Sequence, residues 1–139
     1  MSPAEVATVK RTFARVAPDA DAFAAAFYAR LFELDPDVRD LFHGDIDEQG
    51  RKLMSMLAMA VNGLDRFDQV ASTLVELGER HASYGVRGHH YDTMERALLD
   101  TLRDSLGDEF DAVARSAWTG AYRLFAETMT GGHRPVVAA

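Results

Sequence analysis

The chain has 139 residues, of which 22 are acidic and 15 are basic, so its formal net charge is −7. This acidic balance argues against a general affinity for nucleic acid or anionic membranes, which requires clustered positive charge. The chain has no cysteine, which excludes disulfides, thiolate-bound metal centres and a cysteine nucleophile. Its length suits one domain with a substantial buried core.

The N-terminal sequence and the hydropathy pattern are those of a protein that is neither exported nor embedded in a membrane. The first five residues carry no basic region followed by an apolar run, so we expect no signal peptide. No apolar stretch approaches the ~20 residues that a membrane span needs. We therefore expect a soluble protein of the cytoplasm.

Helical periodicity runs along nearly the whole chain and begins with a capping box. Ser2 and Glu5 stand three positions apart with Pro3 between them, which is typical of a helix start. Apolar residues then recur at intervals of three and four, and proline, glycine and aspartate separate the repeats. The predicted helical segments are residues 3–17, 20–34, 37–42, 48–62, 67–84, 89–106 and 109–130.

These segments predict an all-α domain of seven or eight helices that spans residues 1–139. The sequence has no alternating strand pattern and no Asn-Gly or Asp-Gly hairpin signal. Gly131 and Gly132 end the last helix, and we expect residues 131–139 to form a frayed tail.

His81 interrupts an apolar helical stripe. The stripe consists of Phe67, Val70, Leu74, Leu77, His81 and Tyr84, spaced by three and four residues. The same periodicity that directs the leucines to the core therefore directs His81 there. One interpretation is a core histidine that is hydrogen-bonded to a carbonyl group. The other is a neutral imidazole that ligates a metal in an apolar pocket.

Gln49 and Tyr28 are two further polar residues on apolar stripes. Gln49 precedes Leu53 by one turn of a long helix, so its amide faces inward unless this first turn is frayed. Tyr28 follows Phe27 on a helix that is mostly apolar, where a tyrosine is usually part of the core with its hydroxyl satisfied. Both residues are candidates for a ligand pocket.

Other chemical motifs are absent from the sequence. His89 and His90 are adjacent, so we expect that they do not share a helix face and that the remaining histidines form no metal cluster. The 10 glycines are scattered and form no phosphate-binding loop. No catalytic residue can be assigned with certainty from these patterns.

At these positions the sequence resembles the globin family, and in particular the single-domain bacterial globins that are related to flavohaemoglobins and neuroglobin. Residues 27–42, 49–54 and 77–86, followed by His90 and Tyr91, carry the resemblance. It covers residues from about 4 to 130, and Trp118 and Tyr122 stand where the last globin helix usually has them. The resemblance implies a globin fold of seven to eight helices around a haem pocket.

The resemblance also implies roles for individual residues. His81 would be the proximal ligand of the haem iron, and Phe42 would pack on the haem face. Tyr28 and Gln49 would point at the bound gas and stabilise it. Further haem contacts are implied for Lys52, Leu53, Leu77, Tyr84, Val86 and Tyr91, with Lys52 pairing with a propionate and Val86 and Tyr91 on the proximal side. Because the chain lacks cysteine, the haem would be b-type and held without covalent bonds.

Gly50 lies inside the long helix, where glycine costs about 1 kcal/mol relative to alanine. In globins a small residue at this position lets two helices cross closely. Ala24, one turn before Tyr28, is the matching small residue on the second helix. We therefore expect a close crossing at these two residues.

The implied biochemistry is reversible oxygen binding at a pentacoordinate haem, with high affinity because two hydrogen-bond donors stabilise bound oxygen. Nitric oxide and carbon monoxide are the other expected ligands. Storage or delivery of oxygen is the first expected role. A nitric-oxide dioxygenase and a haem-based gas sensor are the alternatives. We expect a monomer or a homodimer.

The enzymatic alternative needs a source of electrons. Flavohaemoglobins have an attached reductase, whereas 139 residues leave no room for a flavin or nicotinamide domain, so this chain would need a separate reductase. In that family a tyrosine and a glutamate support the proximal histidine. Tyr91 matches the tyrosine, but the glutamate position falls at His133. The missing glutamate weakens the case for an enzyme.

Overall fold

The computed structural model describes residues 1–131, which fold into six α-helices and four short 3-10 helices. In chain order these are α1 (Pro3–Val16), η1 (Ala17–Asp19), α2 (Ala20–Leu34), η2 (Pro36–Leu41), α3 (Ile46–Asn62), η3 (Leu64–Gln69), α4 (Ala71–Ser83), α5 (Gly88–Leu106), η4 (Gly107–Glu109) and α6 (Ala112–Met129). The all-α prediction is confirmed, because the described residues contain no strand. Residues 132–139 of the predicted tail lie outside the described residues.

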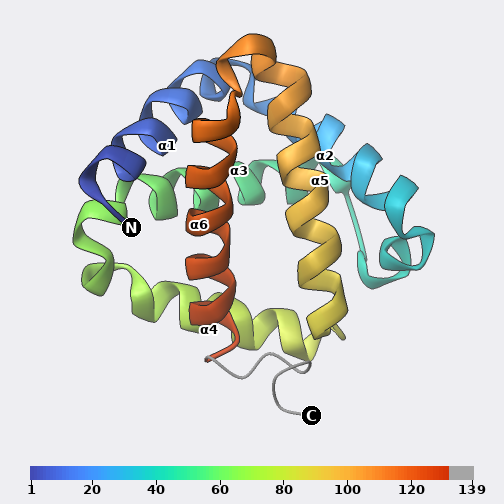
Figure 1. Cartoon of the computed structure of the whole chain (residues 1–139). Coiled ribbons are helices and arrows are strands. Elements are labelled where there is room, and N and C mark those ends of the chain that lie inside the picture. Colours follow the sequence, from blue (N-terminus) through green and yellow to red (C-terminus); the bar gives the residue numbers. More distant parts are fainter. Residues whose placement is uncertain (132–139) are drawn as a thin grey trace.

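The helices pack around one another in a crossed arrangement. In Figure 1, α6 runs beside α5, and α4 crosses the end of α6 that lies nearest the C-terminus. Helix α2 packs against both α3 and α5. Within residues 1–131, every helix is too short or too polar to span a bilayer.

Side-chain caps set the helix starts. The Ser2 hydroxyl accepts a bond from the Glu5 amide, and the Glu5 carboxylate accepts one from the Ser2 amide, so the predicted capping box is confirmed. The Asp45 carboxylate accepts a bond of 3.0 Å from the Asp47 amide. Helix α3 therefore begins at Ile46, two residues before the predicted start near residue 48. Asp111 likewise caps α6 through the Ala114 amide, which moves the start of that helix from the predicted 109 to 112.

The prediction of one continuous helix over residues 67–84 is wrong. Phe67 lies in η3, and α4 begins only at Ala71. The break follows the non-helical backbone of Arg66, at φ −143° and ψ 50°, after which the chain folds back so that Val70 packs against Gly63. Phe67 still reaches the core, where its ring stacks on Phe125 with centroids 6.3 Å apart.

Two glycines permit close helix crossings. A Cβ atom on Gly50 would lie 3.0 Å from the Cβ of Ala24, so the predicted crossing of α2 and α3 at these residues is confirmed. A Cβ atom on Gly78 would lie 1.7 Å from the backbone carbonyl oxygen of Met129. Glycine at position 78 thus lets the backbone of α4 contact the backbone at the end of α6. This contact helps to fix the position of His81, which lies about one turn further along α4.

Buried polar groups tie distant helices together. The Trp118 side chain of α6 is fully buried, and its Nε1 donates a bond of 2.8 Å to the Thr12 hydroxyl of α1. The Asp100 carboxylate of α5 is 5% exposed and accepts a bond of 2.8 Å from Arg30 Nε of α2. Arg103 adds a weaker contact to Asp100 at 3.5 Å. These links connect α1 to α6 and α2 to α5, and none of the residues that form them lines the cavity described next.

Candidate functional site

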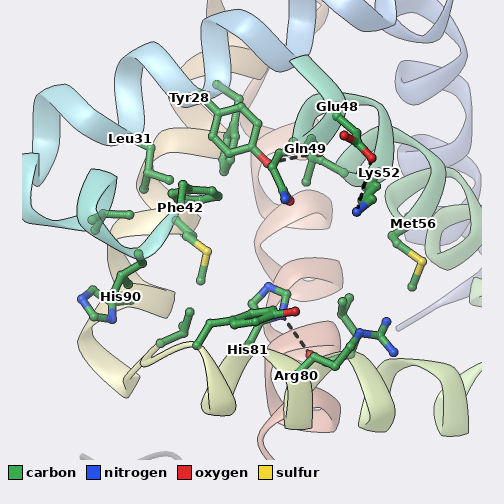
Figure 2. Close-up of a pocket in the computed structure, with 18 of the residues that line it drawn as sticks. Tyr28, Leu31, Phe42, Glu48, Gln49, Lys52, Met56, Arg80, His81 and His90 are labelled. Carbon is green, nitrogen blue, oxygen red and sulfur yellow. Dashed lines mark hydrogen bonds and ion pairs between the residues drawn. The ribbon is translucent and has the colours of Figure 1, made fainter. Parts of the chain in front are cut away.

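A cavity of about 830 Å³ lies between α2, η2 and α3 on one side and α4 and the start of α5 on the other. This volume is within the range of about 300–1,000 Å³ that is usual for small-molecule and cofactor pockets. Figure 2 shows Tyr28 and Gln49 on the opposite side of the cavity from His81. The structure thus brings nearly all of the predicted site residues together around one cavity: Tyr28, Phe42, Gln49, Lys52, Leu53, Leu77, His81, Tyr84 and Val86 all line it.

His81 extends from the last turn of α4 with one ring nitrogen satisfied. Its Nδ1 lies 2.9 Å from the carbonyl oxygen of Leu77. A carbonyl group only accepts hydrogen bonds, so Nδ1 carries the proton and Nε2 keeps its lone pair. Within residues 1–131, Nε2 forms no hydrogen bond. Burial lowers the pKa of His81 below its ordinary value, which outweighs the opposing effect of the Leu77 bond, so the ring is neutral at pH 7.

Tyr91 packs behind His81 and does not line the cavity. The two rings stack with centroids 6.4 Å apart and an interplanar angle of 28°. The backbone carbonyl of Tyr91 accepts a bond of 2.7 Å from the Tyr122 hydroxyl of α6. Tyr91 therefore supports the His81 ring from the helix behind it, which refines the prediction that it lines the proximal side. His133, the position of the missing glutamate, lies outside the described residues.

The turn after α4 shapes the wall next to His81. Gly85 has φ +93°, a conformation that favours glycine, and it ends the helix. The amide of Val86 then donates a bond of 3.0 Å to the carbonyl of His81. This closed turn brings Val86 back to the cavity wall beside the imidazole.

Tyr28 lies in an aromatic cluster on the opposite wall. Its ring contacts Phe27, Phe32 and Phe42, with centroids 5.3, 5.9 and 5.3 Å away. Its hydroxyl donates to the backbone carbonyl of Gln49 at 3.4 Å, which is long for a hydrogen bond. Burial raises the pKa of Tyr28 to about 12, so the hydroxyl stays protonated and is a donor at any ordinary pH.

Gln49 lies in the first turn and a half of α3, in ordered helix. Its backbone N–H donates a hydrogen bond of 3.1 Å to the backbone carbonyl of Asp45, so the alternative of a frayed first turn is wrong. The side-chain amide of Gln49 is half-buried at the cavity and has no hydrogen-bond partner within the described part of the chain. It is therefore available to a molecule in the cavity.

The mouth of the cavity is polar and partly exposed. The Lys52 side chain is 64% exposed and its Nζ lies 3.9 Å from Glu48. Tyr84 is 62% exposed, because it follows the last residue of α4 and no longer continues the buried stripe. Arg80 joins these residues at the rim, and Figure 2 shows Lys52 and Arg80 on facing walls of the same end.

Sequence reasoning missed several residues of the lining. Met56 stands three residues after Leu53, so the helical spacing already indicated it as part of the same wall. Arg80, Met94 and His90 come from α4 and α5. Arg80 and His90 stand in or beside the segments that carry the resemblance, but no role was predicted for any of the three. Their positions depend on how α4 and α5 meet.

The expectation that His89 and His90 point apart is wrong, and Asp35 lies beside them. The potential ligand atoms of Asp35, His89 and His90 lie within 4.8 Å of one another. Adjacent residues of a regular helix diverge by about 100°, but these two histidines lie in the first turn of α5, and their ring centroids are 4.0 Å apart. Asp35 joins them from the end of α2.

The residues around the large cavity fit a haem. A neutral imidazole faces the space with an unpartnered nitrogen, and neutral imidazole is a common ligand of iron. Aromatic and aliphatic side chains form most of the wall, with Phe42 and Leu77 among them. The cations Lys52 and Arg80 at the mouth suit the carboxylates of a haem.

Comparison with known proteins gives a consistent result. The family model described as Globin matches residues 25–129. A flavohemoprotein of Bordetella pertussis is 29% identical over 143 residues, which cover 100% of this chain and 35% of that protein. A flavohemoprotein of Chromobacterium violaceum is 31% identical over 114 residues, covering 79% of this chain and 28% of that protein. A neuroglobin of Dissostichus mawsoni is 30% identical over 119 residues, covering 76% and 75%.

The chain thus spans about a third of the length of the flavohemoproteins it matches and most of the neuroglobin. The family match covers α2 to α6 and includes the walls of the cavity. Globins bind haem and small gases, in agreement with the chemistry of the lining. The resemblance seen in the sequence is confirmed, and the chain belongs to the globin family.

Proposed function

We propose that this protein binds a b-type haem through His81 and uses it to bind oxygen reversibly and with high affinity, for storage or delivery. The observation that carries this proposal is the free Nε2 of His81, which faces the cavity from the wall opposite Tyr28 and Gln49. A haem held by His81 would supply an iron atom that binds small gases.

The proximal residues hold the imidazole in one orientation. The Leu77 carbonyl keeps the proton on Nδ1, and this bond also increases the basicity of Nε2. Tyr91 stacks on the ring and prevents its rotation into the helix bundle. Val86 closes the wall beside it. These contacts hold Nε2 in position to bind iron.

The distal residues supply hydrogen bonds to the gas. The Tyr28 hydroxyl and the Gln49 amide are both donors, and the apolar surroundings strengthen their bonds. The hydrogen bond from the Tyr28 hydroxyl to the backbone carbonyl of Gln49 is long, so the hydroxyl can readily donate to a better acceptor instead. Oxygen gains more negative charge on binding than carbon monoxide, so these donors favour oxygen. An amide is a poor iron ligand, so Gln49 leaves the gas position open.

The rate of oxygen release tests this proposal. Losing a hydrogen bond of this kind costs about 1–3 kcal/mol, so Tyr28→Phe should release oxygen roughly 5- to 150-fold faster. Gln49→Leu should have the second-largest effect. The measurement is stopped-flow displacement of oxygen by carbon monoxide. Release of carbon monoxide from the same variants is the matched control and should change much less. An unchanged oxygen rate in Tyr28→Phe would show that its role is assigned incorrectly.

A second candidate is the conversion of nitric oxide to nitrate. The similarity to flavohemoproteins over the full length of this chain favours it. Each nitrate formed consumes one nitric oxide, one oxygen and one electron, so the activity needs a reductase that supplies the electron. The test is the yield of nitrate from the haem-loaded protein with a purified flavin reductase and reduced nicotinamide. Many nitrates per protein support an enzyme, and one per protein supports a carrier.

A further inference from the structure

A second group of potential metal ligands lies at the other end of the cavity from Lys52. It consists of Asp35 at the end of α2 and of His89 and His90 in the first turn of α5. Figure 2 shows His90 at the end of the cavity far from Lys52 and Arg80. His90 borders the cavity, whereas Asp35 and His89 do not line it. The group therefore lies beside the proposed haem site and contains none of its ligands.

We propose that Asp35, His89 and His90 together bind one divalent transition-metal ion of the zinc class. The two imidazoles and one carboxylate are ligands that zinc, nickel and cobalt accept, and a three-residue set leaves one position for water. Such an ion would join Asp35 at the end of α2 to the first turn of α5.

The distances permit this with small side-chain movements. The potential ligand atoms lie within 4.8 Å of one another. With metal–ligand bonds of about 2.0–2.1 Å, tetrahedral ligands lie roughly 3.4 Å apart. His89 is exposed and Asp35 is only partly covered, so both side chains can rotate toward a shared ion. The two histidine rings already lie close, with centroids 4.0 Å apart and an angle of 46°.

The donor atoms have limited competition from the protein. Asp35 uses Oδ1 to accept a bond of 3.2 Å from the Asp37 amide, which leaves Oδ2 for a metal. His90 accepts a bond of 2.8 Å at Nδ1 from the Arg87 amide, so its proton lies on Nε2. Burial, and then the neighbouring His89, lower the pKa of His90, so its ring is neutral at pH 7 as a metal ligand requires.

A metal on His90 must displace the Arg87 bond. At Nδ1 the ion would replace the amide N–H directly, and at Nε2 it would require the tautomer with its proton on Nδ1. The Arg87 bond is exposed, and an exposed hydrogen bond contributes little net stability. Metal binding therefore releases one amide at the start of α5, and this gives the proposal a second signature besides affinity.

Zinc titration of the full chain, made without a histidine tag and followed by calorimetry, tests the proposal. The parent protein should bind one zinc ion per chain. His89→Ala and Asp35→Asn should bind it at least about tenfold more weakly while keeping the helical circular dichroism of the parent. His43→Ala and His81→Ala are the matched controls and should bind zinc as the parent does. Magnesium should not compete, because imidazole is a poor ligand for it.

Amide hydrogen exchange supplies the second readout. Zinc should accelerate exchange of the Arg87 amide in the parent and leave it unchanged in His89→Ala. The proposal is overturned if the parent binds no zinc, or if His89→Ala and Asp35→Asn bind it as tightly as the parent. Haem binding is not measured in this titration, so a failure of the zinc site leaves the proposed haem site unaffected.

Discussion

The environment of Tyr28 determines the form in which its hydroxyl acts. Three phenylalanine rings surround it, and the side chain is 7% exposed. Water is thus excluded from the position where a phenolate would need it, and the pKa of Tyr28 rises to about 12. A hydrogen-bond donor at this position is therefore maintained across the whole neutral pH range.

The raised pKa predicts a loss of stability at alkaline pH. Below pH 10 both the folded and the unfolded chain keep the Tyr28 proton. Between about pH 10 and 12 only the unfolded chain loses it, so the free energy of unfolding falls as pH rises through this window. Two pKa units correspond to at most about 2.7 kcal/mol. Urea unfolding of the haem-free chain at pH 8, 10 and 11 measures this.

The matched variants are Tyr28→Phe and Tyr84→Phe. Tyr28→Phe should remove this part of the pH dependence, because phenylalanine has no proton to lose. Tyr84→Phe should keep it, since that side chain is 62% exposed. Equal alkaline slopes in the parent and in Tyr28→Phe would contradict the buried, protonated hydroxyl.

Individual side chains differed in how well the sequence predicted them. The direction of His81 followed from its spacing to Leu74 and Leu77, because a regular helix fixes which face a residue occupies. The position of Tyr91 behind that ring did not follow, since it depends on where α5 crosses α4. The proximity of Asp35, His89 and His90 did not follow either. The end of α2 and the start of α5 meet there, and rules for a single helix do not describe such a meeting.

At the scale of the elements, glycines set the distances between helices. Gly78 leaves no space for a side chain against the carbonyl of Met129, and a Cβ on Gly50 would lie 3.0 Å from the Cβ of Ala24, closer than ordinary van der Waals contact. Gly120 on α6 differs, because an added Cβ would meet only the end of Met1 at 4.0 Å. The space available for a side chain thus increases from Gly78 through Gly50 to Gly120.

Alanine substitutions should rank in that order. Gly78→Ala should destabilise the fold by about 2 kcal/mol or more, because the backbone of α6 must move. Gly50→Ala should change stability by less than about 1 kcal/mol, since the gain in helix propensity offsets the tight contact. Gly120→Ala should be neutral or stabilising by roughly 0.5–1 kcal/mol. Thermal unfolding measures all three, and a Gly78→Ala variant as stable as Gly120→Ala would refute the crossing.

The sequence predicted the crossing at Gly50 but not the one at Gly78. Gly50 could be paired with Ala24 through the globin resemblance, whereas the partner of Gly78 is a backbone carbonyl at the far end of the chain. The break between Phe67 and Ala71 was missed because its cause, the non-helical Arg66 and the contact of Val70 with Gly63, is a feature of the turn. Periodicity alone does not detect a kink that keeps the apolar face in register.

At the scale of the whole molecule, the bond between Trp118 and Thr12 connects the first and last helices. Both side chains are buried, with Trp118 fully so. The Thr12 hydroxyl also donates a hydrogen bond of 2.7 Å to the Thr8 carbonyl. Its oxygen can therefore accept the bond from Trp118 while its proton bonds to Thr8. The indole N–H has no other partner among the described residues, and its burial depends on this hydroxyl.

Thr12→Val should therefore destabilise the chain by about 1–3 kcal/mol, the cost of leaving a buried donor unsatisfied. Thr8→Val is the matched control. Thr8 lies one turn earlier on the same helix and is also buried, but its hydroxyl bonds only to the Ala4 carbonyl. Its replacement should cost clearly less. Chemical denaturation with Trp118 fluorescence as the probe measures both, and equal losses would contradict a special role for Thr12.

The overall class and the family were predictable from local sequence patterns, whereas the cavity was predictable only through the family resemblance. Repeated apolar spacing and helix caps indicate helices one at a time, and the three motif segments indicated a globin. The cavity arises because Gln49 and His81, 32 residues apart, face each other across helices whose crossings are fixed by packing. No local pattern contains that relation, and only the family resemblance supplied it.

The most direct test of haem binding is the absorption spectrum of the full chain titrated with haem, recorded in the ferric form, after dithionite reduction, and then with oxygen and with carbon monoxide. We predict a Soret band at one haem per chain. A single broad visible band should follow reduction, and a split pair should follow oxygen. In His81→Ala the band should be lost or shifted and restored by added imidazole. Absence of a Soret band after haem addition to the parent would contradict the proposed function.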